Sequence, residues 1–507
     1  MNRRNKTVAI IVFFLVLFGG LYFLSNQGSN ITTNIAADAL QDRGSLVVDG
    51  ESLVEDNGFY HTNTSDNNTI LVKNGGSLKL SNSILNKTGD TQTSGDDADF
   101  YGVNSAFLVN TNGTIDISNV EINTNSKGSN GIFVTNAEAS GTGSSQGSGG
   151  DAQGGAGGQP PEATGGNAQS GAGGQPPEAA GTGQGSGDGG QAPQASPGQN
   201  TVSGTTSANI NNVKITTHSD KSRGLDATYG GIINAENVVI NTDGQSCAAL
   251  ATDRGEGEVH VKNSEINTGV SRTSGRGSPL VYSTGNITLD NTHGTSYISQ
   301  IACIEGKNSI EINNCDLTGN GEGNRQDGGS YVDLGGVFIY QSMSGDADVG
   351  TSLFSAQNSK LTISSDSPVY TTAPMFHITN TACVINLDNT DLSFGSGVFL
   401  ESSSQNQWGN TGSNGGSVQL NTNNEHIDGN VIVDEISSLN WDMKNTEFKG
   451  AINSTGNTTV KVGEGSTWTL TGDSTVSGLD VTGNIDYGSY SLTVNGQKYT
   501  KQNPYNG

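Results

Sequence analysis

The sequence predicts an all-β fold, a single-stranded right-handed parallel β-helix with coils of about 23–28 residues and a hydrophobic N-terminal helix ahead of it. Three observations predict the β-helix: a short phrase that recurs along the chain, the regular spacing of that phrase, and a composition poor in helix-forming residues. The chain of 507 residues contains 74 Gly, with aromatic residues at 6% and charged residues at 14%. Such a composition suits many short strands joined by turns.

The recurring phrase consists of two alternating apolar residues, an Asn after one spacer, and a further apolar residue three positions later. Examples are SLKLSNSIL around Asn82 and TIDISNVEI around Asn119. Asn suits a corner between strands because it tolerates left-handed φ values, and its amide can bond the Asn of the next coil. The phrase therefore predicts a ladder of Asn side chains. Its Asn residues are Asn82, Asn119, Asn212, Asn237, Asn263, Asn291, Asn314, Asn358 and Asn389.

The spacing of the corner Asn residues defines the coil. From Asn212 the steps are 25, 26, 28 and 23 residues, and two later steps lengthen to 44 and 31 by insertion. A period near 25 is too long for a left-handed hexapeptide helix and lacks the apolar helical stripe of a leucine-rich repeat. A third apolar segment precedes the phrase in each coil. Each coil is therefore predicted to contain, in order, a strand, a turn, a second strand, an Asn corner and a third strand. One coil cannot bury its inward side chains alone, so stacked coils must form the core.

These patterns divide the chain into segments. The β-helix is expected over residues 45–500, with irregular closing coils and a cap over 403–500. Within it, residues 137–207 lose the periodicity and contain a duplication, GGAGGQPPEATGG and SGAGGQPPEAAGT. The step from Asn119 to Asn212 is 93 residues, and removing the 71 residues of this stretch leaves 22, close to one coil. The stretch is therefore expected to be a disordered loop extruded from a turn of the β-helix.

The N-terminus indicates export. A basic start, Met1-Asn2-Arg3-Arg4-Asn5-Lys6, precedes a 17-residue apolar run from Val8 to Leu24. This order is typical of an export segment oriented with its positive end inside. Residues 1–27 are interpreted as an uncleaved signal anchor that spans the membrane, and residues 28–44 as a polar linker. The protein is expected outside the cytoplasm, anchored to the cell membrane or at the cell surface.

The charge limits the partners. The formal net charge is −26, from 49 acidic against 23 basic residues. Such a surface repels phosphate backbones, so nucleic acid is not an expected partner.

The repeat phrases resemble those of the pectate-lyase-like superfamily of right-handed β-helices, particularly its adhesin-like surface proteins. The resemblance covers roughly residues 45 to 500 and lies in the rhythm of the repeat rather than in a functional motif. It implies the fold, but the superfamily includes polysaccharide lyases, glycoside hydrolases, tail spikes and non-catalytic adhesins. Fold alone does not choose among these functions.

Two sets of residues are candidates for catalysis. Asn241-Thr242-Asp243-Gly244 looks like the Asn-Thr-Asp element of polygalacturonases, but the further acidic, Gly-His-Gly and Arg-x-Lys elements of that family are missing. A lyase would instead need carboxylates that hold Ca²⁺ and a basic residue that abstracts a proton. The cluster that fits this need consists of Asp226, Asp243 and Asp253 with Arg223 and Arg254, on adjacent coils. The preferred interpretation is that these are solvated charges in turns.

A strip of aromatic residues is the candidate binding surface. Phe107, Phe133, Phe338, Phe376 and Phe399 are assigned to equivalent positions of one strand stack. If that position faces outwards, the rings can stack on sugars or on a protein partner; if it faces inwards, they belong to the core. The four Cys residues are interpreted as small buried hydrophobes, with a disulfide or a metal site as the alternative. They are Cys247, Cys303, Cys315 and Cys383.

The leading hypothesis is a non-catalytic, adhesin-like surface protein that binds glycans or another surface partner. It requires no cofactor. The second hypothesis is a polysaccharide lyase or glycoside hydrolase acting on acidic polysaccharides, for which Ca²⁺ is the expected cofactor. The third is a structural spacer of the cell envelope, which requires neither a groove nor an aromatic strip.

Overall fold

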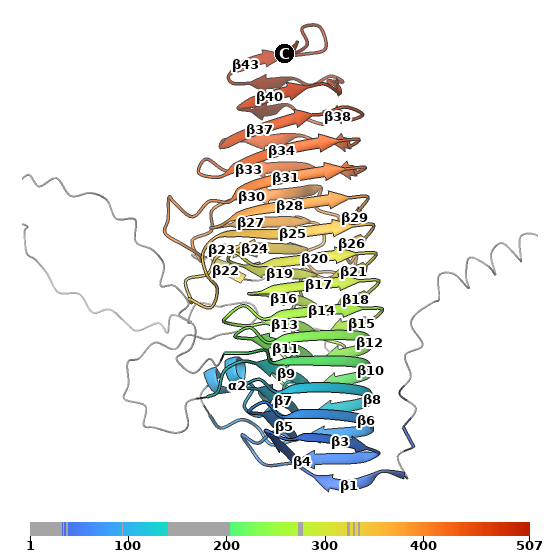
Figure 1. The fold of residues 1–507 in the computed structure, drawn as a ribbon. Helices are drawn as coiled ribbons and strands as arrows, with labels where there is room; N and C mark the ends of the chain where they lie inside the picture. The colour runs from blue at the N-terminus through green and yellow to red at the C-terminus, as the bar shows by residue number, and fades with distance from the viewer. Residues whose placement is uncertain are drawn as a thin grey trace, which may run out of the picture.

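The computed structural model describes residues 39–93, 95–139, 203–271, 277–321 and 335–506, together with a few positions between 33 and 36 and two short strands between 325 and 332. These residues form an elongated stack of coils, coloured from blue at one end to red at the other in Figure 1. Nearly all neighbouring strands pair in parallel, each with the strand one coil away. The predicted β-solenoid is thereby confirmed.

The first face of the solenoid is a sheet of 13 parallel strands. In each coil it is the strand that precedes the Asn phrase. Its members are β2 (Leu46–Asp49), β5 (Ile70–Lys73), β7 (Phe107–Asn110), β9 (Ile132–Thr135), β11 (Leu225–Thr228), β13 (Leu250–Thr252), β16 (Val281–Ser283), β19 (Ala302–Glu305), β24 (Val337–Tyr340), β27 (Phe376–Thr379), β30 (Val398–Ser402), β33 (Asn430–Val433) and β36 (Ile452–Ser454).

The second face comes before the Asn corner and the third face after it. Four long strands bend at the corner and belong to both faces: β6 (Ser77–Lys87), β8 (Thr114–Thr124), β10 (Ser207–Thr217) and β12 (Ile232–Thr242). The other strands of the second face are β3 (Ser52–Asp56), β14 (Glu258–Lys262), β17 (Asn286–Asp290), β20 (Ser309–Asn313), β25 (Thr351–Gln357), β28 (Ala382–Asp388), β31 (Ser417–Asn423), β34 (Ser438–Lys444), β37 (Asn457–Val462) and β40 (Gly478–Val481).

The third face consists of two separate sheets. The first contains the ends of the long strands with β1 (Gln41–Gly44), β4 (Gly58–Thr62), β15 (Glu265–Thr268), β18 (His293–Ser296), β21 (Asp316–Gly319), β26 (Lys360–Ile363) and β29 (Asp391–Ser393). The second contains β32 (His426–Asp428), β35 (Glu447–Lys449), β38 (Thr467–Thr469) and β41 (Asn484–Asp486).

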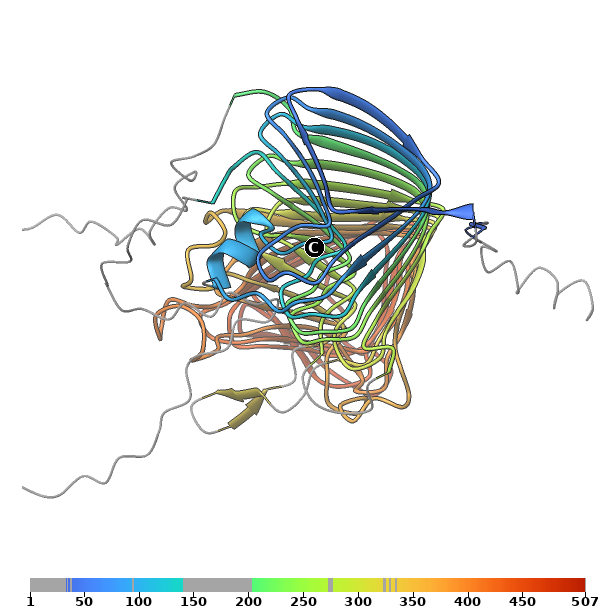
Figure 2. The same ribbon diagram turned by 90° about the horizontal axis from the view of Figure 1, so that it is seen from below.

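Few elements lie outside the three faces. The short helix α2 (Gly95–Tyr101) lies against the outside of the first face, as Figure 2 shows, and β22 (Arg325–Asp327) pairs with β23 (Ser330–Val332) in a hairpin. The C-terminal end carries β39 (Ser474–Val476), β42 (Leu492–Val494) and β43 (Gln497–Tyr499), and the antiparallel β42–β43 pair ends the stack. An antiparallel hairpin covers strand edges that would otherwise be open to other chains.

The corner Asn residues adopt the left-handed backbone conformation expected of them, with φ of 53° at Asn119 and 52° at Asn212. Asn119 Nδ2 donates to Asn82 Oδ1 at 2.6 Å, and Asn212 Nδ2 donates to Asn119 Oδ1 at 3.2 Å. At other corners the acceptor is a carboxylate that precedes the neighbouring corner, such as Asp290 for Asn314 at 3.3 Å. The Asn ladder therefore forms in segments, with carboxylates between them.

Inward side chains of all three faces form one continuous hydrophobic core. In the C-terminal half the core is aromatic, and Phe399, Trp441, Phe448 and Trp468 follow one another at ring distances of 4.7–5.8 Å. Over residues 403–500, where the sequence indicates irregular coils, β31 and β34 still pair through seven consecutive residues. Large inward rings fill these coils even though the Asn phrase is less distinct there.

The glycine-rich insertion leaves the stacking intact. β10 pairs directly with β8 across the insertion, with Ser207 opposite Thr114 and Thr217 opposite Thr124. Residues 140–202, most of the loop predicted to be disordered over 137–207, lie outside the described part of the chain, whereas Ser207 already begins β10. The proposed signal anchor, residues 1–27, also lies outside the described part. Among the described residues, no helix is long and apolar enough to cross a membrane.

The corner conformation can be tested at Asn119. Asn119→Ala places a Cβ without a local hydrogen bond at positive φ and removes two ladder bonds, so we expect it to lower the free energy of unfolding by about 2–3 kcal/mol. Asn119→Gly keeps the backbone conformation and loses only the amide, so its cost is expected to be about 1 kcal/mol. Urea denaturation of both variants measures the difference. Equal losses would show that the left-handed φ carries no cost there.

Candidate functional site

The outer side of the first face is covered, so side chains that point away from the core are nevertheless buried. One register position shows this, because its members are 0–3% exposed from Phe133 to His377. Helix α2 covers part of this side: Thr228 Oγ1 donates to the Phe100 carbonyl at 2.8 Å, and Tyr101 stacks on Tyr229. The position is occupied in turn by Phe133, Asp226, Ala251, Tyr282, Cys303, Phe338 and His377.

Arg223 is the centre of a buried charge cluster under this cover. Its Nη1 lies 3.2 Å from Asp99 Oδ1, its Nε lies 3.4 Å from Asp226 Oδ2, and its Nη2 lies 2.6 Å from Asp253 Oδ2. Lys221 adds a second cation at Asp99, with Nζ 2.8 Å from Oδ2. The guanidinium thus joins helix α2, β11 and the turn after β13 through three carboxylates.

The protonation of this cluster is governed by burial. Burial raises the pKa of Asp226 well above its ordinary value, and it raises the pKa of Asp253 to about 7, although Arg223 opposes both shifts. Burial raises the pKa of Glu305 as well, although Ser342 and Tyr282 donate hydrogen bonds to that carboxylate. A buried network of this kind favours one arrangement of the covering segments, because a charge without its partner is costly in the interior.

The sequence candidates for catalysis are therefore brought together in part. Asp226, Asp253 and Arg223 meet in the cluster, and Arg254 lies beside it, bound to Asp346 at 2.6 Å and stacked over Phe100 at 3.9 Å. The interpretation as solvated charges is wrong for Asp226, Asp253 and Arg223, whose side chains are buried, and Arg254 is half-buried. Asp243 lies elsewhere: its carboxylate accepts bonds from Ser271 N at 2.6 Å and Ser271 Oγ at 2.7 Å.

The cluster does not fit a calcium ion. The Arg223 guanidinium already lies between the three carboxylates, where a cation would have to be bound. Within the described residues, no group of three or more His, Cys, Asp or Glu side chains is arranged to hold a metal ion. Because Asp226 is 0% exposed and Asp253 is 4% exposed, a polysaccharide has no access to either carboxylate. We interpret the cluster as a clamp that holds helix α2 and the neighbouring turns on the first face.

The five Phe residues do not form one exposed strip. Phe107 is opposite Ile132 in register, whereas Phe133 is opposite Leu108, so these two residues occupy positions one residue apart. Phe399 shares neither position, because Leu400 is the residue opposite Phe376. Phe107, Phe376 and Phe399 belong to the main core, and Phe338 packs outside the first face with Tyr340 and Trp408. All five are 0–2% exposed, which leaves no ring face free for a ligand.

The four Cys residues are buried free thiols. Burial raises the pKa of Cys247 to about 12 and that of Cys315 to about 11, which makes both thiols poor nucleophiles. Cys315 points into the core as predicted, whereas Cys303 packs in the separate cluster outside the first face.

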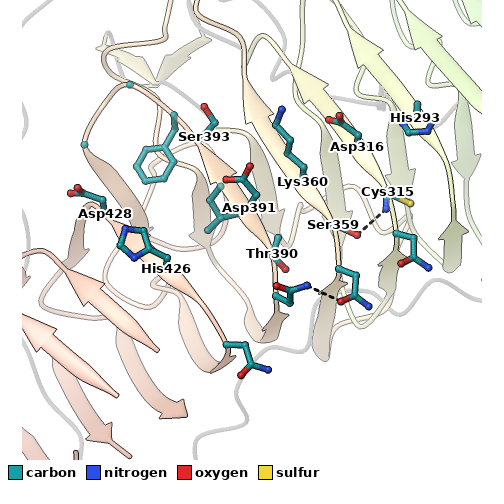
Figure 3. A pocket seen from close by; sticks show the side chains of 18 residues that line it. His293, Cys315, Asp316, Ser359, Lys360, Thr390, Asp391, Ser393, His426 and Asp428 are labelled. Atoms are coloured by element: carbon teal, nitrogen blue, oxygen red, sulfur yellow. Dashed lines mark hydrogen bonds between the residues drawn. The ribbon is translucent and has the colours of Figure 1, made fainter. Parts of the chain in front are cut away.

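An open cleft of about 960 Å³ lies on the third face, between β29 and β32 (Figure 3). One wall is a row of exposed side chains in register on neighbouring strands: His293, Asp316, Lys360 and Asp391. The opposite wall carries His426 and Asp428 of β32.

A second cavity of about 700 Å³ lies on the second face, over strands β25 to β37. Amide side chains bond to one another from coil to coil in and beside it. Asn421 Nδ2 donates to Asn386 Oδ1 at 2.8 Å, Gln419 Nε2 donates to Asn421 Oδ1 at 2.7 Å, and Asn440 Nδ2 donates to Gln419 Oε1 at 2.6 Å. Charged groups flank them, including Lys461 paired with Asp442 at 3.2 Å. These side chains form a half-buried polar row, which we call the amide row.

Sequence reasoning missed both cavities. The step from Asn389 to the next left-handed corner, Asn424, is 35 residues, and Glu425 follows that corner where earlier coils have Val, Ser, Cys or Thr. These two features are the signal that could have located the cleft. The amide row carried a weaker signal, the repeated Asn at outward positions of QLNTN and INLDN.

Comparison with known proteins supplies no relative: no protein-family model matches the chain, and no significant match is found among the curated proteins. The functional argument therefore depends on the geometry of the described residues.

The clamp can be tested by replacing its cation. Arg223→Met leaves three buried carboxylates without their common partner, so we expect a loss of about 3–5 kcal/mol in unfolding free energy. Amide exchange over residues 95–101 should also increase, because α2 loses its ionic contact. Lys214→Met, at a partly exposed ion pair with Glu121, is the matched control and should change stability by less than about 1 kcal/mol. Unchanged protection of α2 in Arg223→Met would refute the clamp.

Glu425 provides a test by pH. Burial raises its pKa to about 8, so the folded state favours the protonated carboxyl. Its contribution to stability is therefore complete below its ordinary pKa, near 4.5, and is lost as the pH rises through about 8. Glu425→Gln removes this pH dependence. The free energy of unfolding of the variant, relative to that of the original protein, should therefore rise by a few kcal/mol between pH 5 and pH 9. Each pH unit between the two pKa values contributes roughly 1.4 kcal/mol. Thermal unfolding at several pH values measures it, and parallel pH profiles would contradict the assignment.

Proposed function

We propose that the protein is a non-catalytic, adhesin-like right-handed β-helix of the cell surface, held to the membrane by residues 1–27, and that it binds glycans along its second face. The observation that carries the proposal is the amide row, a set of linked amide side chains in and beside the cavity on the second face. The clamp around Arg223 gives the rival hypothesis of a lyase or hydrolase little support, because its carboxylates are buried.

The chemistry of the amide row suits a hydroxyl-rich polymer. An amide both donates and accepts hydrogen bonds, as a sugar hydroxyl does. The row repeats with the strand spacing of about 4.8 Å, which is close to the length of one pyranose unit. Asn386 and Asn421 are only partly exposed and are hydrogen-bonded to each other, so their side chains are held in place before a ligand arrives. Preorganisation of this kind lowers the entropic cost of binding.

The charges near the amide row favour neutral over acidic glycans. Asp388, Asp442 and Glu464 line the cavity with Lys444 and Lys461, so acidic groups outnumber basic ones. The whole chain carries a net charge of −26, which adds a repulsive field for polyanions.

The test uses the full chain in a mild nonionic detergent, with a panel of neutral and acidic polysaccharides. We expect retention by one or more neutral polysaccharides, no release of reducing ends, and about tenfold weaker binding by the double variant Asn386→Ala/Asn421→Ala. The matched control is Asn209→Ala/Asn234→Ala, a similar amide pair at 3.3 Å outside the cavity, which should bind like the original protein.

Three results would contradict the proposal. Turnover of any polysaccharide would identify an enzyme. Equal loss of binding in both double variants would place the glycan site elsewhere. Binding to none of the polysaccharides would favour an envelope spacer.

A further inference from the structure

From the cleft on the third face we infer that the solenoid accepts an additional β-strand, supplied by an extended basic peptide of a partner protein, between β29 and β32. This inference concerns a different face and a different class of ligand from the glycan proposal. It is built on four observations: a missing strand pairing, a longer link at the corner, partly exposed core residues and the charge of the rims.

In the coils around the cleft, the strand pairing is missing on this face alone. In the same coils the first face pairs β27 with β30 and β30 with β33, and the second face pairs β28 with β31 through seven residues. On the third face the ladder stops at β29 and restarts at β32 in a separate sheet. Other coils have a bond such as Asp391 N to Ser359 O at 2.8 Å or Glu447 N to Glu425 O at 2.8 Å. Between the described residues His426 and Thr390 the structure has no equivalent bond. The two facing edges therefore present backbone groups that can pair with another strand.

The link at the corner shows that the coils separate here. At several other corners the residue after the Asn donates its backbone N–H to a Ser hydroxyl of the next coil, as Cys315 N does to Ser359 Oγ at 3.0 Å. At the cleft, Thr390 N donates instead to Glu425 Oε1 at 2.8 Å, so a side chain two atoms longer makes the same connection. Glu425 is 3% exposed, and its second oxygen, Oε2, has no hydrogen-bond partner. A buried polar oxygen without a partner is costly, and because the folded state favours the protonated carboxyl, a backbone carbonyl of an added strand could accept its proton.

The floor of the cleft is apolar. Leu392 is in register with Leu361 and Leu317, which are 0% and 1% exposed, yet Leu392 itself is partly exposed. Phe394, which also lines the cleft, is likewise partly exposed. A strand in the cleft would place every second side chain on this floor and the others outwards, because successive side chains alternate between the two sides of a strand. The ligand therefore needs apolar residues at alternate positions.

The rims select the charge of the outward side chains. Asp316, Asp391 and Asp428 are exposed around the cleft, with Lys360 as the one Lys or Arg among its lining residues. Asp428 also pairs with Lys449 of β35 at 3.1 Å. Opposite charges on neighbouring strands attract, so Lys or Arg is favoured at the outward positions of the added strand. Backbone pairing then supplies affinity, while the apolar floor and acidic rims supply selectivity.

The experiment measures binding of a labelled heptapeptide of alternating Val and Lys to the full chain in detergent, by fluorescence anisotropy. We expect saturable binding, at least tenfold weaker binding of an alternating Val and Glu peptide, and a similar loss when alternate backbone nitrogens are methylated. The double variant Asp391→Ala/Asp428→Ala changes two exposed side chains, so it should fold normally and bind about tenfold more weakly. Asp116→Ala, an exposed Asp of the second face, is the matched control and should bind normally.

The outcomes separate the inference from the glycan proposal. Binding that is unaffected by backbone methylation would overturn strand addition, and binding that is unaffected by the Asp391→Ala/Asp428→Ala variant would place the peptide elsewhere. Displacement of a bound polysaccharide by the peptide would also overturn it, because the two sites lie on different faces. Failure of all polysaccharides to bind, together with normal peptide binding, would refute the glycan proposal alone.

Discussion

The structure depends on the left-handed corner at Asn. The residue turns the chain from the second face to the third, and its backbone N–H bonds the carbonyl that precedes the corner of the next coil, as Asn389 does to Asn423 at 3.1 Å. A positive φ is unfavourable for most side chains, so the corner fixes which residue occupies each turn. Once corners align from coil to coil, the alternation of each strand determines which side chains enter the core. Stacking then supplies the burial that no single coil can achieve.

This constraint determines which side-chain positions are buried in the structure and which are accessible for binding. Inward positions are taken by the core, and the outward positions of the first face are taken by a second layer that includes helix α2 and the Arg223 cluster. The second and third faces keep their outward side chains accessible. The amide row uses this freedom without disturbing the coils, whereas the cleft depends on a local loss of pairing. The two candidate surfaces therefore have different physical origins, one in side-chain chemistry and one in backbone geometry.

Much of the fold could be predicted from the sequence because the Asn phrase reports both a backbone conformation and a burial pattern. The meeting of Asp226 and Asp253 also followed from the coil spacing. The alignment of the five Phe residues could not be predicted, since strands of the first face such as β7 and β9 are buried on both sides and show no alternation. Without that alternation, the sequence pattern does not reveal that Phe107 and Phe133 differ by one residue in register. The burial of the charge cluster could not be predicted for a related reason. It depends on α2, a segment between coils that is not part of the repeat.

The measurement that tests the central claim most directly is backbone amide exchange, resolved by residue, at the third face. The claim is that the strands of the third face pair from coil to coil except between β29 and β32. It requires the amides of Asp391 and Glu447, which are bonded to the preceding coil, to exchange slowly, and that of His426 to exchange much faster. Equal protection of the three amides would show that the third face is continuous and would contradict the claim.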